Sequence, residues 1–176
     1  MIGQTWPSEM RTFSDPKSGR AVTQLTHTGN NFHLYFTENS FDLQRNEIIF
    51  LSDRASGEDR LPHEHPRYNI FRMELGTGLI TQLTDEAANA GEPGGCTKTP
   101  DSEIVVYKVG NQIKRLDPAT GNSTVLYTET GAFELGMSSI ASNRRYIAFC
   151  RNEIVDAPEG PNYTGFKESF YRVKDG

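Results

Sequence analysis

The sequence predicts an all-β protein: a β-propeller of four-stranded antiparallel blades, with about two and a half blades present as an incomplete ring. Three observations predict this fold class. Strand-like segments recur in a fixed order, and the spacings between equivalent segments agree. No stretch has the length of a stable helix, because the only helix-like run, residues 85–90, stops at Gly91 and Pro93.

Three classes of short segment make up the repeat. The first is a Thr-rich strand, found at residues 21–26, 79–84 and 123–128. The second ends in an apolar triplet, at residues 48–50, 105–107 and 147–149. The third alternates apolar and polar residues before a glycine turn, at residues 70–78, 113–121 and 170–176. All three classes have the length and composition of β-strands.

The spacing of these segments distinguishes a true repeat from coincidence. The second apolar triplet follows the first by 57 residues, and the third follows the second by 42. The Thr-rich segments, measured at Thr23, Thr81 and Thr124, are 58 and 43 residues apart. Each unit contains an inner strand, the triplet strand, the alternating strand and a Thr-rich outer strand. Four-strand units of this length are typical of propeller blades.

The predicted organisation is one partial propeller over residues 1–176. It contains an outer strand at 20–26, blades at 30–84 and 92–128, and an incomplete blade at 136–176. Propellers are closed rings of typically four to eight blades, which leave no sheet edge open. We therefore expect either a fragment completed by the remaining blades of the same protein, or self-association of copies.

Composition excludes several classes of partner. The chain has 23 acidic and 18 basic residues and a net charge of −5, which argues against a nucleic-acid binder and against electrostatic binding to a membrane. It lacks the run of about 20 apolar residues that crosses a bilayer. Residues 1–10 lack the basic and apolar pattern of a secretory signal, so a cytoplasmic location is expected.

Three segments resemble a known family. Residues 15–26 read DPKSGRAVTQLT, residues 31–41 read NFHLYFTENSF, and residues 47–53 read EIIFLSD. They are similar to the N-terminal blades of oligogalacturonate lyases, which are cytoplasmic seven-bladed propellers with TolB-like repeats. The resemblance implies that this chain is the N-terminal portion of an enzyme that cleaves oligogalacturonides by β-elimination in pectin breakdown, and that it is inactive alone.

The resemblance also implies a divalent metal, usually manganese. In the family, histidines and a glutamine of later blades hold the metal, and a histidine there acts as the base. Those blades would lie beyond Gly176, so no metal ligand and no catalytic residue is assigned within this chain.

The chemistry nevertheless suggests which side chains could bind substrate. β-Elimination removes a proton next to a carboxylate, so the carboxylate needs a neighbouring cation, and arginine can grip it with two hydrogen bonds. Long loops between second and third strands, and loops before inner strands, should share one face. The eight candidates are His27, His33, Arg54, His63, His65, Arg67, Arg151 and Lys167.

Alternatives remain open for these residues and for the whole chain. Charged side chains in surface loops are most often only solvated. The segment His63-Glu64-His65 could place two histidines on one face of a strand as metal ligands, but Pro62 and Pro66 favour a loop. The alternative function is a noncatalytic TolB-like propeller segment that binds sugar or protein.

Overall fold

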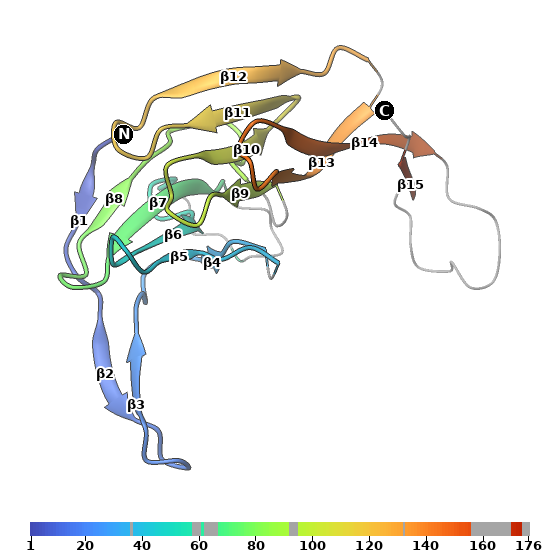
Figure 1. Ribbon diagram of the computed structural model, residues 1–176. Coiled ribbons are helices and arrows are strands. Elements are labelled where there is room, and N and C mark those ends of the chain that lie inside the picture. Colours follow the sequence, from blue (N-terminus) through green and yellow to red (C-terminus); the bar gives the residue numbers. More distant parts are fainter. Residues whose placement is uncertain are drawn as a thin grey trace.

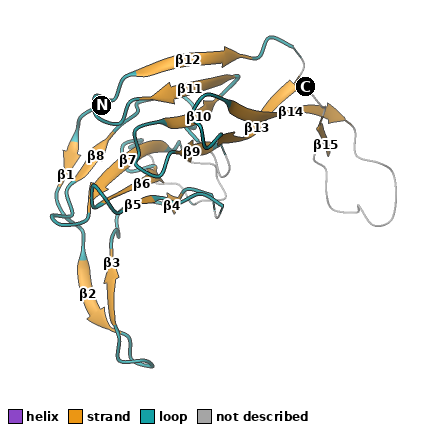
Figure 2. Cartoon of the chain, viewed as in Figure 1, coloured by secondary structure: helices purple, strands orange, loops and turns teal. Residues whose placement is uncertain are grey.

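The computed structural model describes residues 1–35, 37–57, 61, 67–91, 95–131, 133–155 and 170–173. Within these residues every regular element is a β-strand, and all strand pairs are antiparallel. The sheets are arranged as the blades of a partial propeller (Figure 1, Figure 2). The predicted fold class is therefore confirmed, whereas the predicted residue limits of each blade stay predictions.

The first sheet contains six strands. From its inner to its outer edge it consists of β4 (Asn31–His33), β6 (Glu47–Ser52), β7 (Asn69–Glu74), β8 (Ile80–Gln82) and β1 (Thr5–Trp6), and β5 (Phe41–Asp42) pairs with β6 beside β4. The chain start thus adds a strand outside the fourth one, with Trp6 opposite Ile80. A two-residue strand carries no periodic pattern, which is why the sequence did not predict β1 or β5.

The second and third sheets follow the same order from the inside outward. The second consists of β9 (Cys96–Lys98), β10 (Val105–Val109), β11 (Gln112–Leu116) and β12 (Ser123–Thr128). The third consists of β13 (Phe133–Ile140), β14 (Ile147–Val155) and β15 (Phe170–Val173). Each apolar triplet predicted from the sequence lies in the second strand of its sheet, at β6, β10 and β14.

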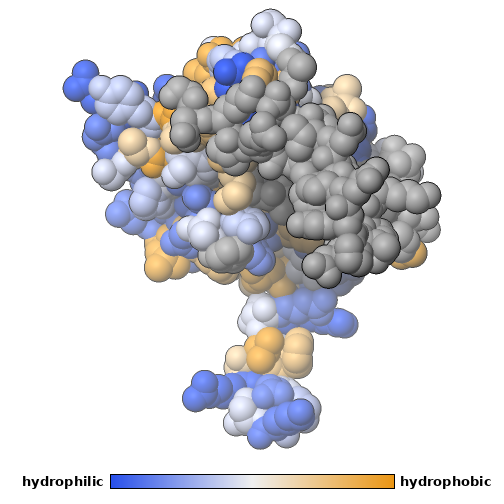
Figure 3. Space-filling model, turned by 90° about the vertical axis from the view of Figure 1, so that its right-hand side faces the viewer, coloured by the Kyte–Doolittle hydropathy of each residue, from blue (hydrophilic) through white to orange (hydrophobic). Residues whose placement is uncertain are grey.

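A fourth, two-stranded sheet extends away from the others. It is the hairpin of β2 (Arg11–Ser14) and β3 (Ala21–Gln24), drawn in blue in Figure 1 and extending downward in Figure 3. Phe13 and Val22 are opposite each other across this hairpin and are 49% and 40% exposed. The hairpin therefore presents an apolar cross-strand pair to solvent.

The turn of this hairpin matches the turns β7–β8 and β11–β12. In each turn a glycine with φ between 69° and 74° donates its N–H to the carbonyl four residues earlier: Gly19 to Asp15, Gly78 to Glu74, and Gly121 to Asp117. The side-chain carboxylate of that earlier residue also accepts a Ser or Thr hydroxyl, from Ser18, Thr77 and Thr120. Because β7–β8 and β11–β12 are the third and fourth strands of their sheets, β2–β3 is built like the outer half of a further blade.

The main core lies between the first and second sheets. Ile49, Leu51 and Ile70 from the first sheet share a buried cluster with Val105 and Tyr107 from the second. Burial of such side chains contributes on the order of 25 cal/mol per Å² of apolar surface. This contact holds the first two blades together.

One polar anchor completes this core. The Tyr107 hydroxyl donates to Glu86 Oε1 at 2.6 Å, and the Lys114 ammonium lies 2.9 Å from the same oxygen. Burial and the hydrogen bond to Glu86 raise the pKa of Tyr107. The buried phenol therefore has the partner that its hydroxyl requires.

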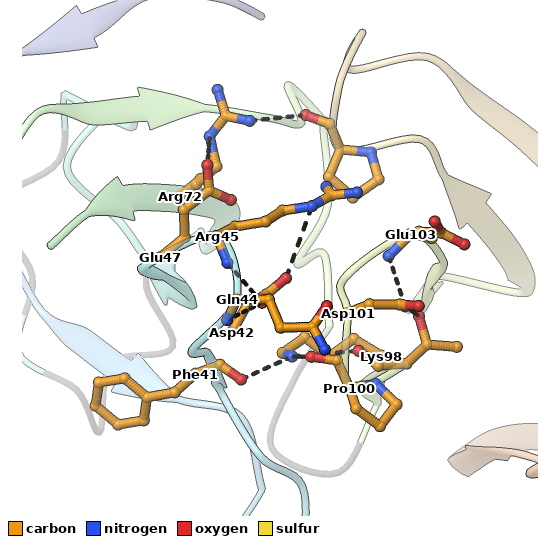
Figure 4. Close-up of polar contacts among 12 residues, drawn as sticks. Phe41, Asp42, Gln44, Arg45, Glu47, Arg72, Lys98, Pro100, Asp101 and Glu103 are labelled. Carbon is orange, nitrogen blue, oxygen red and sulfur yellow. Dashed lines mark hydrogen bonds and ion pairs between the residues drawn. The ribbon is translucent and has the colours of Figure 1, made fainter.

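A second group of polar contacts joins the first two blades, at the strand ends opposite those near Glu86 (Figure 4). Lys98 is only 7% exposed, and its ammonium donates to the carbonyls of Phe41, Thr99 and Pro100 at 3.0, 3.2 and 3.4 Å. Asp42, in the same region, accepts the backbone N–H groups of Gln44 and Arg45 in the turn that follows. A lysine of the second blade is therefore hydrogen-bonded to strand β5 of the first.

The other face of the first sheet is covered by the chain start. Trp6 and Met10 pack there against Phe71 and Met73, and the Trp6 and Phe71 rings meet edge to face at 5.5 Å. The turn β7–β8 belongs to this contact, because a Cβ added to Gly78 would lie 2.7 Å from Ser8 Cβ.

We expect Gly78→Ala to destabilise the protein more than Gly110→Ala. Both glycines have positive φ, 74° and 54°, so alanine is strained at either position by about 1 kcal/mol. Only at Gly78 would the new methyl also collide with Ser8, since nothing lies within 4 Å of it at Gly110. The additional loss should be about 1–3 kcal/mol in urea unfolding. Equal losses for the two variants would contradict the packing of residues 5–10 on this turn.

Candidate functional site

The loops that carry most candidate residues leave the sheets at one end. Loops entering inner strands and loops joining second to third strands share that end, because neighbouring strands are antiparallel. We call it the loop face; its described residues are 25–30, 53–57, 61, 67–68, 83–91, 95, 110–111 and 129–131. Hydrogen bonds join neighbouring loops of this face, since Arg54 Nη2 donates to the carbonyl of Thr28, and the Asn111 amide donates to the carbonyl of Glu129.

Arg54 is buried at the loop face. Its side chain is 1% exposed, and Nη1 donates to Glu9 Oε1 at 3.0 Å. Nη2 donates to Asn31 Oδ1 at 2.8 Å, and Nε donates to Ser52 Oγ at 3.1 Å. The guanidinium thus connects the chain start, the inner strand and the second strand of the first blade. Direct contact between Arg54 and a ligand stays a prediction; in the structure its guanidinium is engaged by Glu9, Asn31 and Ser52.

Glu9 links that network to the hairpin. Its Oε2 accepts the backbone N–H groups of His27 at 2.8 Å and Thr28 at 3.1 Å. Burial raises the pKa of Glu9, but the two backbone hydrogen bonds and the Arg54 charge outweigh it, so the pKa is lowered overall. Glu9 lies before the hairpin, and His27 and Thr28 lie after it. This carboxylate therefore joins the two segments that connect the hairpin to the first blade.

The two candidate histidines on the described part of the chain are both exposed. His27 follows the hairpin, and its Nδ1 lies 3.3 Å from Thr28 Oγ1. His33 is on β4 opposite Phe50, with Nδ1 against the carbonyl of Leu34. His33 borders a hollow of about 140 Å³. The other lining residues of this hollow are Leu25, Thr26, Asn31, Phe32, Ile48, Phe50 and Met73.

Arg151, on β14, has a far more open side chain than Arg54. Its side chain is 38% exposed. Nε donates to Glu129 Oε2 at 2.6 Å, and the guanidinium carbon lies 4.4 Å from the centre of the Phe133 ring. The hydrogen bond from Arg151 and that from the Gly131 N–H lower the pKa of Glu129 to about 2. This carboxylate therefore stays ionised and keeps the arginine in place.

The remaining candidates are not brought together in the described structure. Arg67 is half-buried, and its Nε has no hydrogen-bond partner within the described ranges. His63, His65 and Lys167 lie outside the described residues. Sequence reasoning missed Glu9 and Glu129, because each is an ordinary loop carboxylate whose arginine partner is 45 or 22 residues away.

The described residues do not form a metal site. Nowhere among them do three or more His, Cys, Asp or Glu side chains converge in a way that could hold an ion. Cys96 is buried, and burial raises the pKa of its thiol to about 12. No step of a reaction is therefore assigned here to a metal bound by these residues. None of the described residues forms a helix long and apolar enough to span a membrane.

Comparison with solved structures identifies the architecture. An oligogalacturonate lyase in complex with manganese superimposes with a TM-score of 0.72 and 22% identity, over 86% of this chain. An oligogalacturonate lyase from Vibrio parahaemolyticus superimposes with a TM-score of 0.73 and 19% identity, over 87% of this chain. The chain has the fold of part of these lyases.

The match is partial in length, since the chain spans 38% of each solved lyase. No family model matches the sequence, and comparison with curated proteins finds no match either. The resemblance to the lyases that the sequence suggested is thus confirmed in three dimensions, at the level of the fold.

We expect a double-mutant cycle to show coupling between Glu9 and Arg54. Arg54→Gln should destabilise the chain by about 1–3 kcal/mol, because it leaves a nearly buried carboxylate without its cation. Glu9→Gln and Arg54→Gln together should cost less than the sum of the two, in urea unfolding at neutral pH. Additive losses would show that the pair does not interact.

The Glu9 pKa also predicts a dependence on pH. Because the folded-state pKa lies below the ordinary value of 4.5, the contribution of Glu9 to stability is present above that pH. It is lost as the pH falls through the folded pKa. Glu9→Gln should therefore lose less stability than the parent chain on acidification below about pH 4.5.

Proposed function

We propose that the chain is the N-terminal portion of an oligogalacturonate-lyase-like enzyme, which cleaves oligogalacturonides by β-elimination in pectin breakdown. The observation that carries this proposal is the common fold with two oligogalacturonate lyases at TM-scores of 0.72 and 0.73. Since fold alone does not determine activity, the proposal also needs a site that suits an anionic sugar.

The hairpin β2–β3 supports the view that further blades complete this ring. Its turn has the hydrogen bonds of a third-to-fourth-strand turn, yet among the described residues its two strands pair only with each other. The first two strands of that blade would come from elsewhere in the complete protein. The 176-residue chain alone is then expected to be inactive.

The proposed reaction assigns separate tasks to this chain and to the rest of the ring. β-Elimination breaks the bond to the leaving oxygen at C4 as a base removes the C5 proton, and charge develops on the adjacent carboxylate. A divalent metal, manganese in one of the compared lyases, would neutralise that charge when bound outside the described residues. The tasks of this chain would be to bind and orient the sugar.

The loop face and the adjoining strands β4 and β14 would supply the groups for that task. His27 and His33 are exposed, and Arg67 and Arg151 are half-buried. Arg54 would act indirectly, by fixing Thr28 and Asn31 next to the two histidines. We further propose, in line with the lyase assignment, a cytoplasmic enzyme that binds an oligogalacturonide and neither nucleic acid nor membrane.

The test is an assay of the intact protein purified from its source cell. With trigalacturonate as substrate, we expect ultraviolet absorbance of an unsaturated uronide to rise, to stop after chelation and to return when manganese is added. The 176-residue chain alone should give no product. Undiminished turnover after chelation would contradict the metal-assisted route. Binding of trigalacturonate without any product would favour the noncatalytic TolB-like segment that binds sugar or protein.

A further inference from the structure

The Arg151 guanidinium lies where the second and third blades meet at the loop face. An apolar cluster lies between these blades, in which the centres of the Tyr127 and Phe149 rings are 4.9 Å apart and Leu135 is buried. The arginine rests on Phe133 with its side chain 38% exposed. The interface therefore ends in a cation that has one apolar side and one side open to solvent.

Glu129 determines which edge of that cation is open. Its side chain is 3% exposed, and its carboxylate accepts hydrogen bonds from Arg151 Nε at 2.6 Å and from Arg151 Nη2 at 3.2 Å. Tyr127 donates its hydroxyl to Oε2 at 2.9 Å, and the Gly131 N–H donates to Oε1 at 2.8 Å. A carboxylate held by four donors cannot rotate away, so the plane of the guanidinium is fixed as well.

The other edge of the guanidinium is unused in the described structure. Within the described ranges, Nη1 has no hydrogen-bond partner, and Nη2 has a second N–H beyond the one that Glu129 accepts. These N–H groups form the planar fork that matches the two oxygens of a carboxylate. The turn at 110–111, which joins β10 and β11 on the same face, has only two residues.

We propose that the outer edge of Arg151 is a carboxylate-binding site and that Glu129 is its positioning residue. The identity of its ligand as a uronate carboxylate of an oligogalacturonide rests on the proposed function. The geometry alone requires only a planar carboxylate. The pair Glu129–Arg151 is neutral overall, so the site recognises the shape of the carboxylate more than it attracts charge over distance. It should discriminate an acid from its methyl ester, which is neutral and has only one carbonyl oxygen as a good acceptor.

Arg144 is a matched control on the same sheet. It is 42% exposed and is also paired with carboxylates, Asp101 and Glu103, at 2.5 and 2.8 Å. It lies between β13 and β14, at the strand ends opposite the loop face. A variant of Arg144 therefore removes a similar ion pair between the second and third blades without altering the proposed site.

The experiment measures KM and kcat for trigalacturonate in the intact protein and in three single variants of it. The variants are Arg151→Gln, Glu129→Gln and Arg144→Gln. We expect Arg151→Gln to raise KM about tenfold or more, with kcat within about twofold, because a charge-assisted bidentate contact is lost. Glu129→Gln should raise KM less, and Arg144→Gln should leave it unchanged. Arg151→Lys keeps the charge and the aliphatic stem but loses the fork, so it should resemble Arg151→Gln.

The methyl ester of trigalacturonate separates recognition from stability. In the parent protein the acid should bind more tightly than the ester by calorimetric titration, and Arg151→Gln should remove most of that preference. A loss of thermal stability in Arg151→Gln with the preference intact would show that the pair only joins two blades, and would overturn the inference. If Arg151→Gln does not fold, the same comparison with Arg151→Lys decides.

The outcomes for this site and for the proposed function are distinguishable. Product formation with a KM unaffected by Arg151→Gln would overturn the carboxylate site and leave the lyase proposal standing. Binding of trigalacturonate that depends on Arg151, without any product, would support the site and contradict the lyase proposal.

Discussion

The structure depends on the need to cover both faces of each blade. In β6, successive residues from Ile48 to Ser52 are all buried, although side chains of a strand alternate between two faces. One face of β6 is covered by Val105 and Tyr107 of the second blade, and the other by Trp6 and Met10 of the chain start. The short N-terminal strand β1 is therefore part of the core of the first blade.

The same constraint explains where arginines are placed. At the loop face Arg54 lies over the Phe50 and Phe71 rings at 5.5 and 5.6 Å, and Arg151 lies over Phe133. An arginine can close an apolar interface in this way only if a carboxylate neutralises it there. Glu9 and Glu129 supply that carboxylate, but only Arg151 keeps a substantial exposed edge. Exposure, more than the number of basic residues, thus distinguishes a possible ligand contact from a structural ion pair.

Much of the fold could be predicted from the sequence because it is encoded locally. The apolar triplets in β6, β10 and β14 and the glycine turns recur in a fixed order, and each indicates its own strand. The candidate site was less accessible. Arg54 belongs to the predicted loop, but its partner Glu9 is 45 residues away in a segment without any pattern, so its burial could not be predicted. Glu129 likewise becomes recognisable only when folding brings it next to Arg151 on β14.

The hairpin β2–β3 exposes backbone groups that can pair with any extended chain. In the described structure β2 pairs on one side only, with β3, and Phe13 adds an exposed apolar side chain. Such an edge ordinarily invites uncontrolled stacking of strands. Here the hairpin begins with Arg11, and its tip carries Lys17 and Arg20 against the single carboxylate of Asp15, so copies that stack in register would bring net positive charge together. The hairpin can therefore stay open for the correct strand while its own charges slow aggregation.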